Sequence, residues 1–126
     1  MVGESFEAEI TERRGMARYP AERVRSGPKE AATEALDDLA SRAEQFVVHF
    51  DVDVIDFVDF PVADVPQHNA GLTFQDTMSC LEAFASSPGF GGLVITEFNP
   101  DHADEEGALA ATFVREVAGD LAGKTP

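Results

Sequence analysis

Hydrophobic residues recur along this chain at two spacings, which predict helices that alternate with strands. Three segments, near residues 28–43, 73–86 and 110–122, carry apolar residues every three or four positions, as amphipathic helices do. Two shorter apolar runs, Phe46–Phe50 and Gly92–Thr96, are typical of buried strands. The predicted order is therefore helix, strand, long loop, helix, strand and helix.

Capping residues mark where the first two helices begin. Ser26 or Gly27 can cap the first helix, with Pro28 at its first position. Thr73 opens the second helix, and Asp76 stands three residues later, as in a capping box. The positions predicted to be buried on the three helices are Ala32, Ala35, Leu36, Leu39 and Ala43, then Phe74, Met78, Leu81 and Ala85, then Ala110, Phe113, Val114, Val117 and Leu121.

Strands separated by helices pair in parallel through right-handed crossovers. We therefore expect an α/β fold with three layers, α/β/α, whose mainly parallel sheet is covered on both faces. Ligands of such sheets bind at the carboxyl ends of the strands. Asp51 and Asp53 follow the first predicted strand, and Glu97 follows the second. A functional site is expected at this edge.

Acidic residues outnumber basic ones over most of the chain. The net charge of −15 opposes binding to nucleic acid or to an anionic membrane, and suits metal ions or cationic substrates. Residues 1–29 carry six Lys/Arg and five Glu, a net of +1, whereas the rest carries three Lys/Arg and nineteen Asp/Glu, a net of −16. We therefore predict a divergent N-terminal arm, residues 1–27, and a domain of residues 28–126.

The length and composition fit one domain with a hydrophobic core, since 44% of the 126 residues are hydrophobic. No apolar run approaches the ~18 residues of a membrane span, and the N-terminus lacks the apolar region of a signal peptide. The single cysteine, Cys80, cannot form an internal disulfide. We expect a cytoplasmic protein in which Cys80 acts as a small hydrophobic residue.

Three aspartates, Asp51, Asp53 and Asp56, follow the first predicted strand directly. Alternate side chains of an extended backbone share a face, so Asp51 and Asp53 are expected to project together. Two oxygen donors at a strand end form half of a divalent-metal site. A solvated strand end is the alternative interpretation of the same pattern.

Three motifs occur in order along the chain: Asp51-x-Asp53-x-x-Asp56, Gly71-Leu72-Thr73 and Thr96-Glu97-Phe98-Asn99-Pro100. In this order and at these separations they resemble the C-terminal portion of the ureohydrolase family, which includes arginases, agmatinases and formiminoglutamases. The resemblance covers residues 30–122 and implies a truncated arginase-like fold.

The resemblance implies a manganese-dependent hydrolase that cleaves a guanidinium or amidine C–N bond of arginine, agmatine or a related compound. It assigns Asp51 and Asp53 to two Mn²⁺ ions, and Glu97 to the cationic group of a small guanidino substrate. Carboxylates suit Mn²⁺, a pair of metal ions acidifies a shared water, and a carboxylate pairs well with a guanidinium. The family's assembly into oligomers implies a homo-oligomer or a complementing chain.

The family's upstream metal motifs, Gly-Gly-Asp-His and Asp-x-His-x-Asp, do not occur in this sequence. The segment Asp101-His102-Ala103-Asp104 has similar residues at a different spacing and place. Two aspartates cannot complete the coordination of two ions. We therefore expect weak metal binding, and little hydrolase activity, from this polypeptide alone.

Four further residues are candidates for supporting roles around the metal or substrate: His49, Asp56, His68 and Asn69. Alternation places His49 on the face of Asp51, and a hydrogen-bonded core histidine is the alternative. Asp56 is otherwise an acid that stabilises the loop. His68 and Asn69 are otherwise exposed loop residues.

Two functions without ureohydrolase chemistry remain as alternatives. A receiver-like regulatory domain also places acids at a strand end, but it needs a lysine after a late strand, and Lys124 lies past the last predicted helix. A non-catalytic remnant or a metal-binding α/β module requires no catalytic residues beyond those in this sequence. Titration with Mn²⁺ separates a metal site from a remnant that binds nothing.

Overall fold

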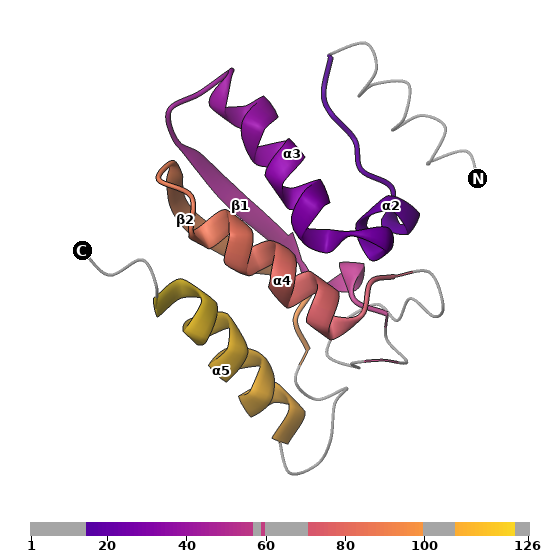
Figure 1. Ribbon diagram of the computed structural model, residues 1–126. Coiled ribbons are helices and arrows are strands. Elements are labelled where there is room, and N and C mark those ends of the chain that lie inside the picture. Colours follow the sequence, from indigo (N-terminus) through magenta and orange to yellow (C-terminus); the bar gives the residue numbers. More distant parts are fainter. Residues whose placement is uncertain (1–14, 57–58, 60–70, 100–107, 123–126) are drawn as a thin grey trace.

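The computed structural model describes residues 15–56, 59, 71–99 and 108–122. They form a two-stranded parallel sheet and accompanying helices (Figure 1). The longer elements follow the order predicted from the sequence, and two short helices, one before residue 28 and one after the first strand, were not predicted. In chain order the elements are α2 (Ala21–Ser26), α3 (Pro28–Ala40), β1 (Phe46–Asp51), the short 3-10 helix η1 (Val52–Val54), α4 (Phe74–Ala85), β2 (Phe90–Thr96) and α5 (Ala108–Ala122).

The predicted parallel pairing of β1 with β2 is confirmed. Val48 lies opposite Leu93, and Asp51 lies opposite Thr96. Helix α4 belongs to the connection between the two strands, as a parallel pair requires. Both strands therefore bring their carboxyl ends to the same edge of the sheet.

The three long helices run side by side, with α4 between α3 and α5 (Figure 1). Helix α3 begins at Pro28 after Gly27, as predicted. Helix α4 begins after Thr73, whose hydroxyl accepts a hydrogen bond from the backbone N–H of Asp76 at 3.0 Å. Within the described part of the chain, no helix is both long enough and apolar enough to span a bilayer.

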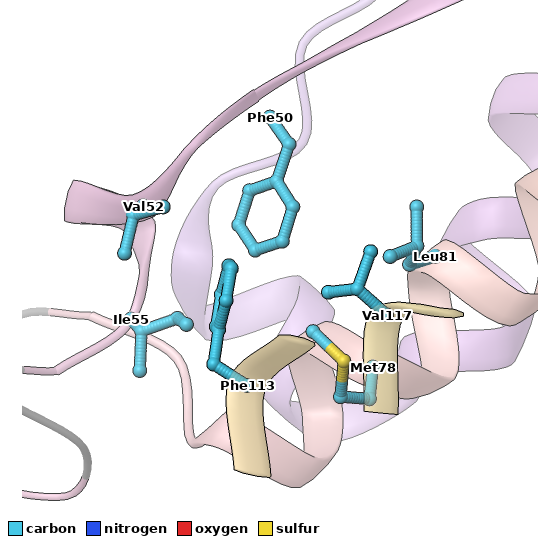
Figure 2. Packing of buried hydrophobic residues seen from close by; sticks show 7 residues of the cluster. All are labelled: Phe50, Val52, Ile55, Met78, Leu81, Phe113 and Val117. Atoms are coloured by element: carbon cyan, nitrogen blue, oxygen red, sulfur yellow. The ribbon is translucent and has the colours of Figure 1, made fainter. Parts of the chain in front are cut away.

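The hydrophobic core joins one face of the sheet to α4 and α5 (Figure 2). Its buried members are Phe50, Val52, Ile55, Met78, Leu81, Phe113 and Val117. Phe113 is 1% exposed, and its ring centroid lies 5.9 Å from that of Phe50 and 4.6 Å from that of Phe98. The burial of these side chains is the main force that holds α5 on the sheet.

The described helices leave the other face of the sheet open. Val47 and Val94, which alternate with the core-facing residues, are 62% and 52% exposed. The α/β class with a parallel sheet is confirmed. The expectation that β2 is a fully buried strand is wrong, because no described element covers the Val94 side.

Among the side chains whose burial the structure describes, two that were predicted to lie on buried helical stripes are exposed. Ala43 lies beyond the end of α3 at Ala40, so it does not lie on the helical stripe. Val114 is 58% exposed. Its neighbour Phe113 faces the core, and the next residue of a helix is rotated away by about 100°.

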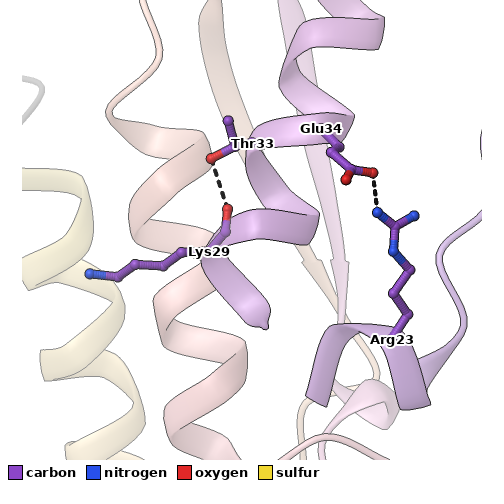
Figure 3. Close-up of polar contacts among 4 residues, drawn as sticks. All are labelled: Arg23, Lys29, Thr33 and Glu34. Atoms are coloured by element: carbon purple, nitrogen blue, oxygen red, sulfur yellow. Dashed lines mark hydrogen bonds and ion pairs between the residues drawn. The ribbon is translucent and has the colours of Figure 1, made fainter. Parts of the chain in front are cut away.

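The described part of the N-terminal arm lies against α3 through arginine side chains. Arg23 forms an ion pair with Glu34 of α3, which Figure 3 shows from close by. Arg42, just after α3, donates a hydrogen bond to the carbonyl oxygen of Gly15 at 2.7 Å. These contacts connect the arm to the middle of α3 and to the segment just after its end.

Candidate functional site

The three motifs that are far apart in the sequence meet at the carboxyl edge of the sheet. Pairing of β1 with β2 places Asp51 opposite Thr96, the residue before Glu97. A separate parallel bridge joins Ile55 to Leu72. The aspartate segment therefore lies between the Gly-Leu-Thr segment and the Glu-x-Asn segment.

Backbone hydrogen bonds hold the Gly-Leu-Thr segment against the aspartate segment. The N–H of Leu72 donates to the carbonyl of Val54 at 2.7 Å, and the N–H of Asp56 donates to the carbonyl of Leu72 at 2.8 Å. A Cβ atom on Gly71 would lie 2.6 Å from the Asp56 nitrogen and from the Val54 oxygen. Glycine is required here because the two backbones approach too closely for any side chain.

Asp51 and Asp53 lie on different elements. β1 ends at Asp51, and Asp53 belongs to η1, so the prediction that both project from one face of an extended strand is wrong. The turn forms because Oδ1 of Asp51 caps it, accepting a hydrogen bond from the Asp53 N–H at 2.9 Å. Asp51 is exposed and Asp53 is half-buried, with its own Oδ1 shielded from solvent.

Glu97 is exposed at the end of β2 and has a left-handed backbone, with φ of 62°. A residue with a Cβ adopts this conformation at a cost of about 1–2 kcal/mol. Its neighbours fix the turn: the Thr96 hydroxyl lies 2.9 Å from Nε2 of His49, and Phe98 stacks on Phe113. Strained backbone of this kind concentrates at functional sites.

The supporting residues predicted from the sequence have different outcomes. His49 is exposed and forms the cross-strand hydrogen bond to Thr96, so the alternative of a buried core histidine is wrong. Asp56 is half-buried and its backbone joins the bridge to Leu72. His68 and Asn69 lie outside the described residues, and their roles stay predictions.

Sequence reasoning missed Asp59, which helps to fix the start of α4. Its Oδ2 accepts a hydrogen bond from the N–H of Phe74 at 2.8 Å. The negative charge of the Asp59 carboxylate is also stabilised by the positive, N-terminal end of the dipole of α4. No local spacing signals this cap, because fifteen residues separate the two partners and the loop must bring them together.

The chemistry of these donors fits part of a manganese site. Carboxylate oxygens are the ligands that Mn²⁺ prefers, and each carboxylate has lone pairs left after one hydrogen bond. Among the residues that the structure describes, no three His, Cys, Asp or Glu side chains gather closely enough to hold an ion. Asp51 and Asp53 can thus supply a partial coordination shell.

A model of the Arginase family matches residues 2–119. The chain belongs to the arginase family. Members of this family are hydrolases that act on C–N bonds. The match also takes in most of the arm of residues 1–27. Among curated proteins, no match is found.

Solved structures of this family share the fold. Arginase from Bacillus caldovelox has a TM-score of 0.74 and 22% identity, over 95% of this chain and 38% of that one. Arginase from Entamoeba histolytica, in complex with L-ornithine, has a TM-score of 0.76 and 24% identity, over 98% and 40%. Formiminoglutamase from Trypanosoma cruzi, with Mn²⁺, has a TM-score of 0.73 and 18% identity, over 96% and 41%. This chain therefore spans about two fifths of their length.

Proposed function

We propose that this chain supplies the carboxylate part of a manganese-dependent ureohydrolase site. In this proposal Asp51 and Asp53 bind the metal, and Glu97 binds the cationic group of the substrate. The observation that carries the proposal is the meeting of the three family motifs at one edge of a parallel sheet. The Mn²⁺ named with the Trypanosoma cruzi formiminoglutamase supports the choice of metal.

The aspartates have local structure that suits metal binding. The N–H of Asp53 holds one oxygen of Asp51, which limits the rotation of that carboxylate before any ion arrives. Fixing a ligand in advance reduces the entropy lost on binding. When bound, a pair of Mn²⁺ ions lowers the pKa of a shared water towards neutrality.

Glu97 is suited to recognise a planar cation. Its carboxylate is exposed, and the flanking residues Thr96 and Phe98 are both anchored, so the direction of its backbone is set. A carboxylate can accept two parallel hydrogen bonds from a guanidinium or amidinium group. Arginine, agmatine, guanidino acids and formiminoglutamate all carry such a group. Glu97 therefore recognises the cationic group and does not discriminate among these compounds.

In this proposal, a second copy or a complementing chain supplies further metal ligands. Two carboxylates leave most positions around two Mn²⁺ ions to other ligands. The open sheet face at Val47 and Val94 offers apolar area for a second copy or a complementing chain that carries those ligands. The chain alone is expected to bind manganese weakly and to release little urea or related amide.

Manganese titration followed by electron paramagnetic resonance tests the proposal, because free Mn²⁺ gives a strong signal that binding reduces. We expect the wild-type chain to bind Mn²⁺ weakly, and the double variant Asp51→Asn with Asp53→Asn to lose that binding. Asparagine keeps an oxygen to accept the Asp53 N–H, so η1 should persist. Asp37→Asn, on exposed α3 surface, is the matched control.

Three outcomes of this titration decide between the functions. Loss of binding in the double variant and not in Asp37→Asn supports a metal site at the sheet edge. Equal Mn²⁺ binding by wild type and the double variant refutes the assignment. Absence of binding by the wild type favours the non-catalytic module instead.

A further inference from the structure

An apolar cavity of about 320 Å³ lies between α3, α4 and β1. Helix α3 lines it with alanines, including Ala32 and Ala35, where larger side chains would fill the space. Helix α4 contributes Cys80 and Phe84. The cavity exists because the small face of α3 meets α4 across a gap that no described side chain occupies.

The N-terminal arm closes one side of this cavity. Tyr19 and Val24 of the arm belong to its lining. The arm is held there by the Arg23–Glu34 ion pair, and by Arg25, whose guanidinium donates to the carbonyl of Gly71 at 3.1 Å. The cavity is therefore a pocket between elements rather than a flat surface.

The polar groups of α4 in the lining already have partners. The hydroxyl of Thr77 donates to the carbonyl of Thr73 at 2.9 Å, and the thiol of Cys80 donates to the carbonyl of Pro28 at 3.4 Å. Burial, with a smaller contribution from Asp76, raises the pKa of the Cys80 thiol, which keeps it neutral. An anionic ligand such as a carboxylate would lose its hydration in this mostly apolar lining, where it would also meet the carboxylate of Asp51.

We propose that this cavity binds a small neutral hydrocarbon, of the alkylbenzene class. An apolar cavity of about 150 Å³ in a protein stays dry and binds benzene or xenon. The present cavity has about twice that volume, which leaves room for a ring with a short alkyl chain. Recognition depends mainly on shape and dispersion, because most of the lining is carbon and the polar groups of α4 are already hydrogen-bonded. The other polar side chains of the lining are those of Tyr19, His49 and Asp51.

The single cysteine of the chain provides a reporter inside the site. The rate at which Ellman's reagent modifies Cys80 is measured with and without toluene. At a toluene concentration ten times the dissociation constant, the rate is expected to fall about tenfold, because only the unoccupied fraction reacts. Benzoate, with a similar ring and a charge, is expected to give no protection.

Variants of α3 separate binding in the cavity from general effects of the solvent. Ala35→Leu fills the cavity and should abolish the protection by toluene, with Ala35→Val as the smaller replacement if circular dichroism shows that the leucine variant does not fold. Ala40→Leu, at the exposed end of the same helix, should keep it. Absence of protection in the wild type, or equal protection in the filled variant, overturns the proposal.

Discussion

Asp120 is expected to make this fold less stable at neutral pH than at acidic pH. It lies in the last turn of α5, and its Oδ2 is buried without a hydrogen-bond partner among the described residues. Burial raises the pKa of its carboxyl to about 6, with contributions from Glu82 of α4 and from Glu116. The negative end of the helix dipole also disfavours a carboxylate at this position.

The direction of this pH dependence follows from the linkage between proton binding and folding. The pKa of Asp120 is raised above the ordinary value of 3.8, so the folded state holds this proton more tightly than the unfolded state. The stability it contributes is complete below pH 4 and is lost as the pH rises to about 6. A rise of this size corresponds at most to about 3 kcal/mol. Because the side chain is partly open to water, we expect about 1 kcal/mol.

Urea unfolding of the wild type and of Asp120→Asn, from pH 4 to pH 8, measures the contribution of Asp120 to the free energy of unfolding. The asparagine variant should be more stable by about 1 kcal/mol at pH 7.5 and should lose that advantage towards pH 4. Asp37→Asn, an exposed acid of α3, should show no such trend. An advantage of Asp120→Asn that does not change with pH would refute the reasoning.

Three further predictions concern the fold and the bridge at the site. Phe113→Ala removes the most central ring of the core and should cost about 3–5 kcal/mol in urea unfolding; a cost below about 1 kcal/mol would contradict the described packing. Gly71→Ala should lower the free energy of unfolding by about 1–3 kcal/mol, because the new Cβ meets backbone atoms. Gly92→Ala, with open space around its Cβ, should lower it less. Equal effects of the two substitutions would contradict the close approach of the backbones at Gly71. Thr73→Ala removes the cap of α4 and should cost about 1 kcal/mol by the same measurement, and an unchanged midpoint would count against the cap.

Much of the fold could be predicted from the sequence because its signals are local. Pro28 after Gly27 and the Thr73 cap mark helix starts, and both are observed. The exposure of Val94 could not be predicted in this way. A run of apolar residues predicts a strand, but whether both faces are covered depends on elements elsewhere in the protein.

The residues of the candidate site could be predicted from the sequence better than their arrangement in space. The order of the three motifs indicated Asp51, Asp53 and Glu97, and the structure brings their segments together. The 3-10 turn at Asp53 was missed because alternation assumes that the strand continues. The left-handed backbone of Glu97 has no local signal either, since it depends on the anchoring of its neighbours.

Strand β1 serves the core and the candidate site with adjacent residues. Phe50 is 6% exposed and packs in the core, whereas Asp51 is exposed and caps η1. In a chain with a net charge of −15, removing the charge of an exposed acid such as Asp51 relieves repulsion between acidic side chains. The apolar contacts of the core are left intact. Metal binding and folding should therefore be separable, so that Asp51→Asn weakens manganese binding without lowering the urea midpoint. A parallel loss of both would mean that Asp51 supports the core and not a metal site.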